Sequence, residues 1–154
     1  MNNSIQREVT FPQPREAVWA ALTTRELLAE WMYPNDFEPR VGHRFTFQVP
    51  PNPKLNFEGL TVHCEVLEYD PPRGSDNSAG NKNDGGRLVF SWTVSGPVVD
   101  TRVSFQLLRD GAGTRMLFEH AGFDLSQPYA DQAFAGAGYG WAKMLGQLGD
   151  VLQR

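Results

Sequence analysis

The sequence has a single cysteine, Cys64, among its 154 residues. One thiol forms no internal disulfide, and it leaves a zinc ion without its usual sulfur ligands. The three histidines, His43, His63 and His120, are far apart in the chain and share no metal-ligand spacing. A dinucleotide fingerprint is absent as well, because the glycine-rich segment 136–140 lies inside a helical pattern rather than directly after a strand. We therefore expect neither a metal nor a cofactor.

Basic charge and long apolar runs are also scarce. Lysine and arginine number 14 against 18 aspartates and glutamates, which gives a net charge of −4, and the basic residues form no run. A nucleic-acid-binding protein needs a basic surface, so we expect no nucleic-acid partner. No apolar stretch approaches the roughly 20 residues of a membrane span, and the N-terminal residues lack the pattern of a signal peptide. These absences predict a cytoplasmic protein without a membrane span.

What the sequence does have is the size and apolar content of one globular domain. Hydrophobic residues make up 40% of the chain and aromatic residues 12%. This length supports one sizeable core but not two, so we predict a single domain over residues 1–154. Many aromatic residues fall at alternating positions, where they would fill a core or line an apolar cavity.

Alternating polar and apolar residues predict that most of the chain is β-strand. In residues 4–11, Ile5, Val9 and Phe11 share one face, and Arg7 is the exception on that face. A proline-rich break and a tight turn separate some of the later strands. The further predicted strands are residues 41–49, 57–69, 88–94, 103–107 and 116–120.

Two short helices are predicted between the first and second strands. Pro14 suits the first turn of a helix, and Val18 and Leu22 lie on the apolar face of that helix. Thr23 or Thr24 can cap a second helix, which runs towards residue 32. The chain therefore begins with one strand followed by two helices in series.

The longest predicted helix lies at the end of the chain, in residues 134–152. Five glycines in this segment each cost a helix roughly 0.8–1 kcal/mol relative to alanine, so the helix needs packing along its apolar side. We predict that it lies in the concave face of one antiparallel sheet, in an α+β fold. The residues that form its apolar stripe are Phe134, Trp141, Leu145, Leu148 and Leu152.

Six segments of the chain resemble one protein superfamily when they are taken together and in order. They resemble the helix-grip superfamily of START-related lipid-transfer proteins and birch-pollen-allergen-like proteins (SRPBCC). Within it, they are most similar to the family named for the C-terminal domain of the ATPase activator of the ninety-kilodalton heat-shock chaperone. The segments are PREAVWAALTTRELLAEWM at 14–32, FEPRVGHRFTF at 37–47, EVLEYDPPR at 65–73, LVFSW at 88–92, GTRMLFEHAGF at 113–123 and GWAKMLGQL at 140–148.

The resemblance implies a helix-grip fold. That fold is a curved antiparallel sheet of about six strands around a long C-terminal helix, with two short helices after the first strand. The segments 50–54 and 73–86 depart from the family's pattern, the first in its prolines and the second in its length. Residues 73–86 are rich in Ser, Asn, Asp and Gly, and we predict a mobile surface loop there.

The resemblance also implies a class of function, but it names no ligand. Members of the superfamily typically enclose a cavity between the sheet and the C-terminal helix. Our lead hypothesis is therefore a non-catalytic protein that binds a small apolar or amphipathic molecule. One alternative is an enzyme of the polyketide-cyclase type that uses the same cavity. Another is a protein-interaction module like the chaperone activator, which would expose an apolar patch larger than a few hundred Å². The sequence does not determine whether the protein has a protein partner or forms a homodimer.

His120 is the first polar candidate for the cavity. Alternation places it on the inward face with Met116 and Phe118, where it either contacts a ligand or is hydrogen-bonded internally. Glu119 points to the opposite face, so Glu119 and His120 do not form an acid–base pair in one pocket. Cys64 also faces inward, where a thiol usually acts as a small hydrophobic group. We assign no catalytic residue.

The other predicted cavity residues are aromatic or lie on the terminal helix. We expect Trp31 and Phe123 to act as gates at the mouth of the cavity. Gly138 is expected to allow either tight packing or room for a ligand. The full predicted set is Trp31, Phe45, Phe47, Cys64, Phe90, Trp92, Phe105, Phe118, His120, Phe123, Gly138, Trp141 and Leu145.

Overall fold

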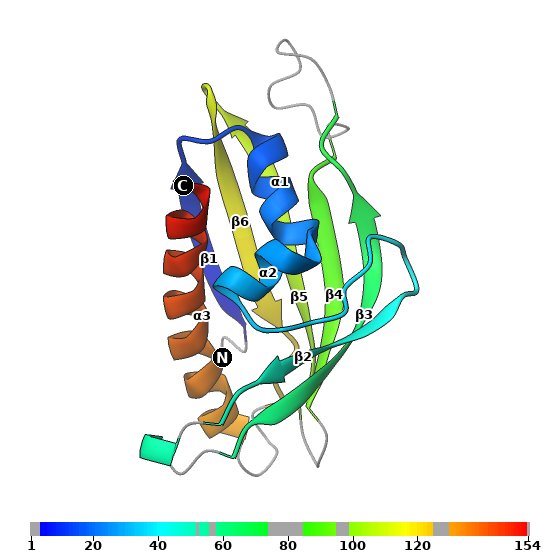
Figure 1. The fold of residues 1–154 in the computed structure, drawn as a ribbon, viewed down its shortest axis with the longest axis vertical. Coiled ribbons are helices and arrows are strands. Elements are labelled where there is room, and N and C mark those ends of the chain that lie inside the picture. Colours follow the sequence, from blue (N-terminus) through cyan, green and yellow to red (C-terminus); the bar gives the residue numbers. More distant parts are fainter. Residues whose placement is uncertain are drawn as a thin grey trace.

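The protein is an α+β fold, and its elements follow the predicted order (Figure 1). The computed structural model describes residues 4–51, 53–55, 58–73, 85–94, 99–124 and 130–153. Most of the predicted loop at 73–86 lies outside these residues. Its expected mobility therefore stays a prediction. The elements are β1 (Ile5–Phe11), α1 (Arg15–Thr23), α2 (Arg25–Trp31), β2 (Arg44–Val49), the 3₁₀ helix η1 (Pro53–Leu55), β3 (Leu60–Asp70), β4 (Arg87–Val94), β5 (Val99–Asp110), β6 (Gly113–Ala121) and α3 (Ala130–Leu152).

The six strands form one antiparallel sheet in the order β1-β6-β5-β4-β3-β2. The strands from β2 to β6 pair with their neighbours in sequence, whereas β1 pairs with the last strand, β6. In that pair Ile5 is opposite His120 and Val9 is opposite Met116. The predicted alternation is confirmed, because inward residues such as Phe45 and Phe47 are buried while their neighbours Arg44 and Gln48 are exposed. This sheet is the predicted helix-grip arrangement.

The helices α1 and α2 follow β1 because prolines end the strand. Pro14 occupies the position before α1 in an extended conformation (φ −70°, ψ 162°), which suits a residue that cannot donate a backbone hydrogen bond. Thr24 precedes α2, but its side chain makes no capping hydrogen bond. The Thr23 hydroxyl donates instead to the carbonyl of Trp19 at 2.7 Å. Thr24 is therefore the N-cap residue of α2, as predicted, but it caps the helix without a side-chain hydrogen bond.

A bulge in β3 changes which side chains face inward. The pairing with β4 shifts between Val66 and Glu68, so Leu67 and Glu68 both lie on the outer face. Tyr69 then faces inward and its ring lies 5.5 Å from that of Trp19. Strict alternation from Val66 would have put Glu68 inward instead. The bulge keeps this carboxylate out of the core.

Glycines allow two close turns of the chain. Gly111 (φ 59°) follows Asp110 in the β5–β6 hairpin, as the sequence predicts. Gly86 (φ 80°) precedes β4, where a Cβ atom would lie only 2.8 Å from the carbonyl oxygen of Leu107. The Gly86 N–H also donates to the carbonyl of Asp70 at 2.6 Å, which joins the residue before β4 to the last residue of β3.

All three α-helices cover the same face of the sheet. The helix α3 contacts both α1 and α2, and α1 also contacts β5 and β6. In Figure 1, α3 runs alongside β1, and its first half lies at the same end of the molecule as η1. Within the described ranges, no helix combines the length and apolar character needed to cross a membrane. The core lies between these helices and the inward face of the sheet.

Candidate ligand-binding site

The predicted cavity residues meet in the layer between the sheet and α3. All of them except Gly138 are buried, with exposed fractions between 0% and 9%. They come from four parts of the fold: α2, the strands β2 to β6, the segment after β6, and α3. Their backbones are far apart in sequence, but the antiparallel pairing aligns the inward positions of neighbouring strands. Phe45 is opposite Cys64, and Phe105 is opposite both Leu88 and Phe118.

Trp141 is the centre of the aromatic packing. Its ring centroid lies 4.5 Å from Phe118, 5.5 Å from Trp92 and 6.3 Å from Phe105. The rings are tilted or edge-on to one another, which is the arrangement that aromatic pairs prefer. Trp141 is 1% exposed and packs the middle of α3 against β4, β5 and β6.

A chain of three hydrogen bonds crosses this apolar layer. The indole N–H of Trp141 donates to Nδ1 of His120 at 2.9 Å. Nε2 of His120 lies 2.6 Å from the Thr101 hydroxyl, and that hydroxyl donates to the carbonyl of Trp92 at 2.9 Å. Since Nδ1 accepts a hydrogen bond and the Thr101 proton is already donated, Nε2 carries the imidazole proton and donates it to Thr101. We call this series of hydrogen bonds, which links Trp92, Thr101, His120 and Trp141, the polar chain.

The polar chain holds His120 in its neutral form. The side chain is fully buried, and burial lowers its pKa to about 3. Both ring nitrogens are used in the chain, and each has the partner that the neutral ring requires. Within the described residues, His120 therefore satisfies buried groups and presents no free nitrogen to a reacting molecule.

The core is less completely filled beside the first half of α3. Gly138 lies on the apolar stripe between Phe134 and Trp141, and a Cβ atom built there would meet none of the described atoms within 4 Å, as at the other glycines of α3. Phe134, Ala137 and Gly138 are partly exposed, whereas Met144 and Leu148, further along the helix, are buried. The polar chain borders this region, because the Phe123 ring lies 5.1 Å from Phe134 and 4.6 Å from His120.

Trp31 has a different role from the one expected, whereas Cys64 has the predicted one. Trp31 is 0% exposed, its indole N–H donates to the carbonyl of Ala21 at 2.9 Å, and its ring packs edge-on against Phe105. It anchors α2 in the core and does not reach a mouth where it could act as a gate. Cys64 is 4% exposed, and burial raises the pKa of its thiol, with Asp36 as a smaller cause. The thiol is therefore un-ionised and packs as a small apolar group.

Comparison with known proteins identifies the family. Residues 12–153 match the sequence profile of the Activator of Hsp90 ATPase homolog 1-like protein family. The chain belongs to this family. The match covers nearly all of the sequence, from the end of β1 to the end of α3, so the resemblance inferred from six short segments is confirmed. No curated protein matches the chain significantly.

Solved structures of similar chains have the same fold as this member of the Hsp90-activator-like family. Protein MLL2253 from Mesorhizobium loti is 28% identical, with a TM-score of 0.78, over 98% of this chain and 97% of that one. Protein BH1534 from Bacillus halodurans is 25% identical, with a TM-score of 0.70, over 99% of both chains. CalU16 from Micromonospora echinospora is 25% identical, with a TM-score of 0.70, over 97% of this chain and 75% of that one. These similarities support a ligand-binding fold and name no ligand.

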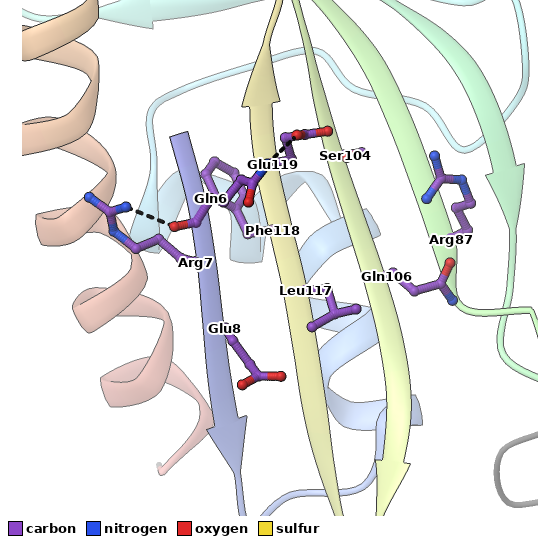
Figure 2. Close-up of a pocket in the computed structure, with 9 residues that line it drawn as sticks. All are labelled: Gln6, Arg7, Glu8, Arg87, Ser104, Gln106, Leu117, Phe118 and Glu119. Carbon is purple, nitrogen blue, oxygen red and sulfur yellow. Dashed lines mark hydrogen bonds between the residues drawn. The ribbon is translucent and has the colours of Figure 1, made fainter. Parts of the chain in front are cut away.

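A hollow lies on the outer face of the sheet of this family member, where the sequence predicted no site (Figure 2). Its volume is about 720 Å³, and most of its polar side chains form hydrogen bonds or ion pairs with one another or with residues next to the hollow. Gln6 donates to Glu119 at 2.9 Å, and Arg87 pairs with Glu68 at 3.0 Å. Among the residues that the structure describes, no three His, Cys, Asp or Glu side chains cluster as metal ligands. The lining residues are Gln6, Arg7, Glu8, Arg87, Ser104, Gln106, Leu117, Phe118 and Glu119.

Thr101 is the member of the polar chain that the sequence analysis missed. The predicted strand began at residue 103, whereas β5 begins at Val99 and puts Thr101 on the inward face opposite Trp92. The available signal was the alternation of Thr101 with Val103 and Phe105, which extends the inward row by one position. Its importance depends on His120, which lies 19 positions away in sequence.

Proposed function

We propose that this protein binds a small apolar or amphipathic molecule between the sheet and the first half of α3. The ligand occupies the unfilled space beside Gly138 and contacts the aromatic rings that surround Trp141. Ordinary ligand sites are mostly apolar and aromatic, with few polar groups. This region has that composition.

The observation that carries the proposal is the contrast between Gly138 and its neighbours on the same stripe. Core-facing positions are normally filled to the density of an organic crystal, and empty space in the core is destabilising. At Gly138 a position on the apolar stripe has no side chain, and a Cβ atom there would meet none of the described atoms within 4 Å, whereas Trp141, one turn later, is 1% exposed. Membership of a ligand-binding fold family is consistent with a molecule in that space.

The polar chain favours binding over catalysis. A general acid or base must reach a reacting group with a free proton or lone pair. Both nitrogens of His120 are already hydrogen-bonded, and its pKa of about 3 keeps it neutral at physiological pH. His120 was the polar side chain on which the polyketide-cyclase alternative relied, and its hydrogen bonding therefore supports a binding role.

The exposed apolar residues do not favour the protein-interaction alternative. In the described part of the chain, the exposed large apolar side chains are Val41, Leu67, Leu117 and Tyr139. They lie before β2, on β3, on β6 and on α3, and β4 and β5 separate Leu67 from Leu117 in the sheet. Scattered single apolar residues are normal on a protein surface, so these do not form the patch that a partner would need.

The test compares a variant that fills the space with a matched control. Gly138→Phe places a ring beside Trp141, whereas Gly146→Phe makes the same change at an exposed position of α3, where a Cβ atom also meets nothing within 4 Å. Native mass spectrometry of freshly purified protein reports co-purified molecules, and titration with 1-anilinonaphthalene-8-sulfonate reports affinity. We expect Gly138→Phe to lose the co-purified mass and to bind the dye at least tenfold more weakly than the control. Equal dye affinity in both variants would overturn the proposed site.

A further inference from the structure

The hydrogen bond from Trp141 to His120 joins α3 to the sheet. Among the residues that the structure describes, it is the one hydrogen bond between an α3 side chain and a strand. The strands are joined to one another by backbone ladders, whereas α3 is held on them by side-chain packing and by this bond. The five glycines of α3 also lower its own helix propensity. We therefore expect α3 to detach more easily than the central strands β4 and β5 separate.

This bond uses the one atom of His120 that can take up a proton. Nε2 already carries the imidazole proton and donates it to the Thr101 hydroxyl at 2.6 Å. A second proton must therefore bind at Nδ1, which accepts the indole N–H of Trp141 at 2.9 Å. A proton on Nδ1 would place two N–H groups against each other. The proton and the indole of α3 thus compete for the same lone pair.

The side chains around the His120 ring are uncharged on each described element that packs against it. The carboxylate of its neighbour Glu119 lies on the outer face, where Gln6 donates to it at 2.9 Å. Burial is the cause of the lowered pKa of His120, and no charged group among the described residues contributes to that shift. The ring contacts of His120 and the residues opposite it on β1 and β5 are Trp92, Thr101, Phe123, Trp141, Ile5 and Val103.

We propose that the contact between Trp141 and His120 is an acid-sensitive switch, in which protonation of His120 releases α3 from the sheet. The proposal concerns the helix itself and does not depend on a bound ligand. Detachment of α3 exposes Nδ1, which then takes up a proton near the ordinary histidine pKa of about 6.5. The docked state binds fewer protons than the detached state, so detachment becomes easier as the pH falls. The opening constant of α3 should rise about 25-fold between pH 7 and pH 5.

Amide hydrogen exchange, followed by mass spectrometry, measures the opening of each segment of the wild-type protein. The exchange rates at pH 7 and pH 5 are first corrected for the intrinsic rate at each pH. We expect the second half of α3 to open more readily than β4 and β5, and its opening constant to rise about 25-fold at pH 5. If α3 exchanged in step with β4 and β5 at both pH values, the helix would open only with the whole fold, and the proposal would be overturned without the need for a variant.

His120→Gln and His63→Gln form a matched pair of variants. His63 is exposed on β3, so His63→Gln should keep the full rise in the opening constant of α3. His120→Gln has no group that titrates at the contact with Trp141, so α3 should open equally often at pH 7 and pH 5. A rise of the wild-type size in folded His120→Gln would overturn the role of His120.

Discussion

The two halves of α3 are made of similar residues but are packed differently. In the second half, Trp141, Met144, Leu145 and Leu148 are all at most 6% exposed. In the first half, the equivalent positions hold Phe134, Ala137 and Gly138, which are partly exposed. The second half fixes the helix on the sheet, and the described residues of the first half are packed less completely.

The two halves of α3 indicate that the apolar stripe of one helix can serve different purposes along its length. A helix with several glycines gains little stability from its own propensity, so packing along the stripe must hold it in place. The packing of Trp141 and the polar chain meets that need in the second half. Because the helix is anchored there, the first half can tolerate an unfilled position at Gly138.

Trp141→Ala should remove the anchor of the second half. Replacement of a buried tryptophan by alanine costs roughly 3–5 kcal/mol, and a domain of this size has about 5–15 kcal/mol in total. The change also leaves Nδ1 of His120 without its donor. We expect the urea midpoint of unfolding to fall close to zero denaturant. Tyr139→Ala, at a position that is 79% exposed, should shift stability by less than about 0.5 kcal/mol. Equal effects of the two changes would contradict the assigned packing.

Acid should weaken the same anchor through His120. The unfolded chain takes up a proton on this residue near pH 6.5, whereas the folded protein does so only near its lowered pKa of about 3. The unfolded state therefore binds more protons between these values, and stability falls as the pH drops through that window. At pH 5 the loss should be about 2 kcal/mol. The loss of stability is measured by comparing urea unfolding at pH 7 and at pH 5.

His120→Gln keeps a polar side chain but cannot titrate, so it should lose most of this dependence on pH. The variant is expected to be less stable than wild type at pH 7 by about 1–3 kcal/mol, because the polar chain no longer has its ideal partner. A wild-type slope in His120→Gln between pH 7 and pH 5 would show that other groups cause the acid sensitivity.

Alanine substitutions at Gly138 and Gly146 should separate stability from binding. A Cβ atom meets nothing within 4 Å at either position, so each substitution should stabilise the protein by up to about 1 kcal/mol through helix propensity. Only Gly138→Ala adds a methyl group to the proposed ligand space. Its affinity for 1-anilinonaphthalene-8-sulfonate should fall by a factor of a few, whereas Gly146→Ala should bind like wild type. Destabilisation by Gly138→Ala would mean that the space is already filled.

The sequence alone predicted the local direction of most side chains. The alternation in β2 separated the buried Phe45 and Phe47 from the exposed Arg44 and Gln48. Prolines and glycines placed the breaks after β1 and in the β5–β6 hairpin, because these residues restrict or extend the backbone locally. Such features depend on neighbours in the chain, so composition and period were sufficient to predict them, and with them the order of the elements.

Other features depended on residues that are distant in sequence, and only the tertiary structure decided them. Alternation placed His120 inward, but it could not say whether the ring faces a ligand or forms hydrogen bonds within the protein. That outcome requires Thr101 on β5 and Trp141 on α3 to reach the same point. The β3 bulge, which turns Glu68 outward, is likewise a property of the pairing with β4. A sequence period specifies the face of an element, whereas three-dimensional packing selects the partner and the space beside it.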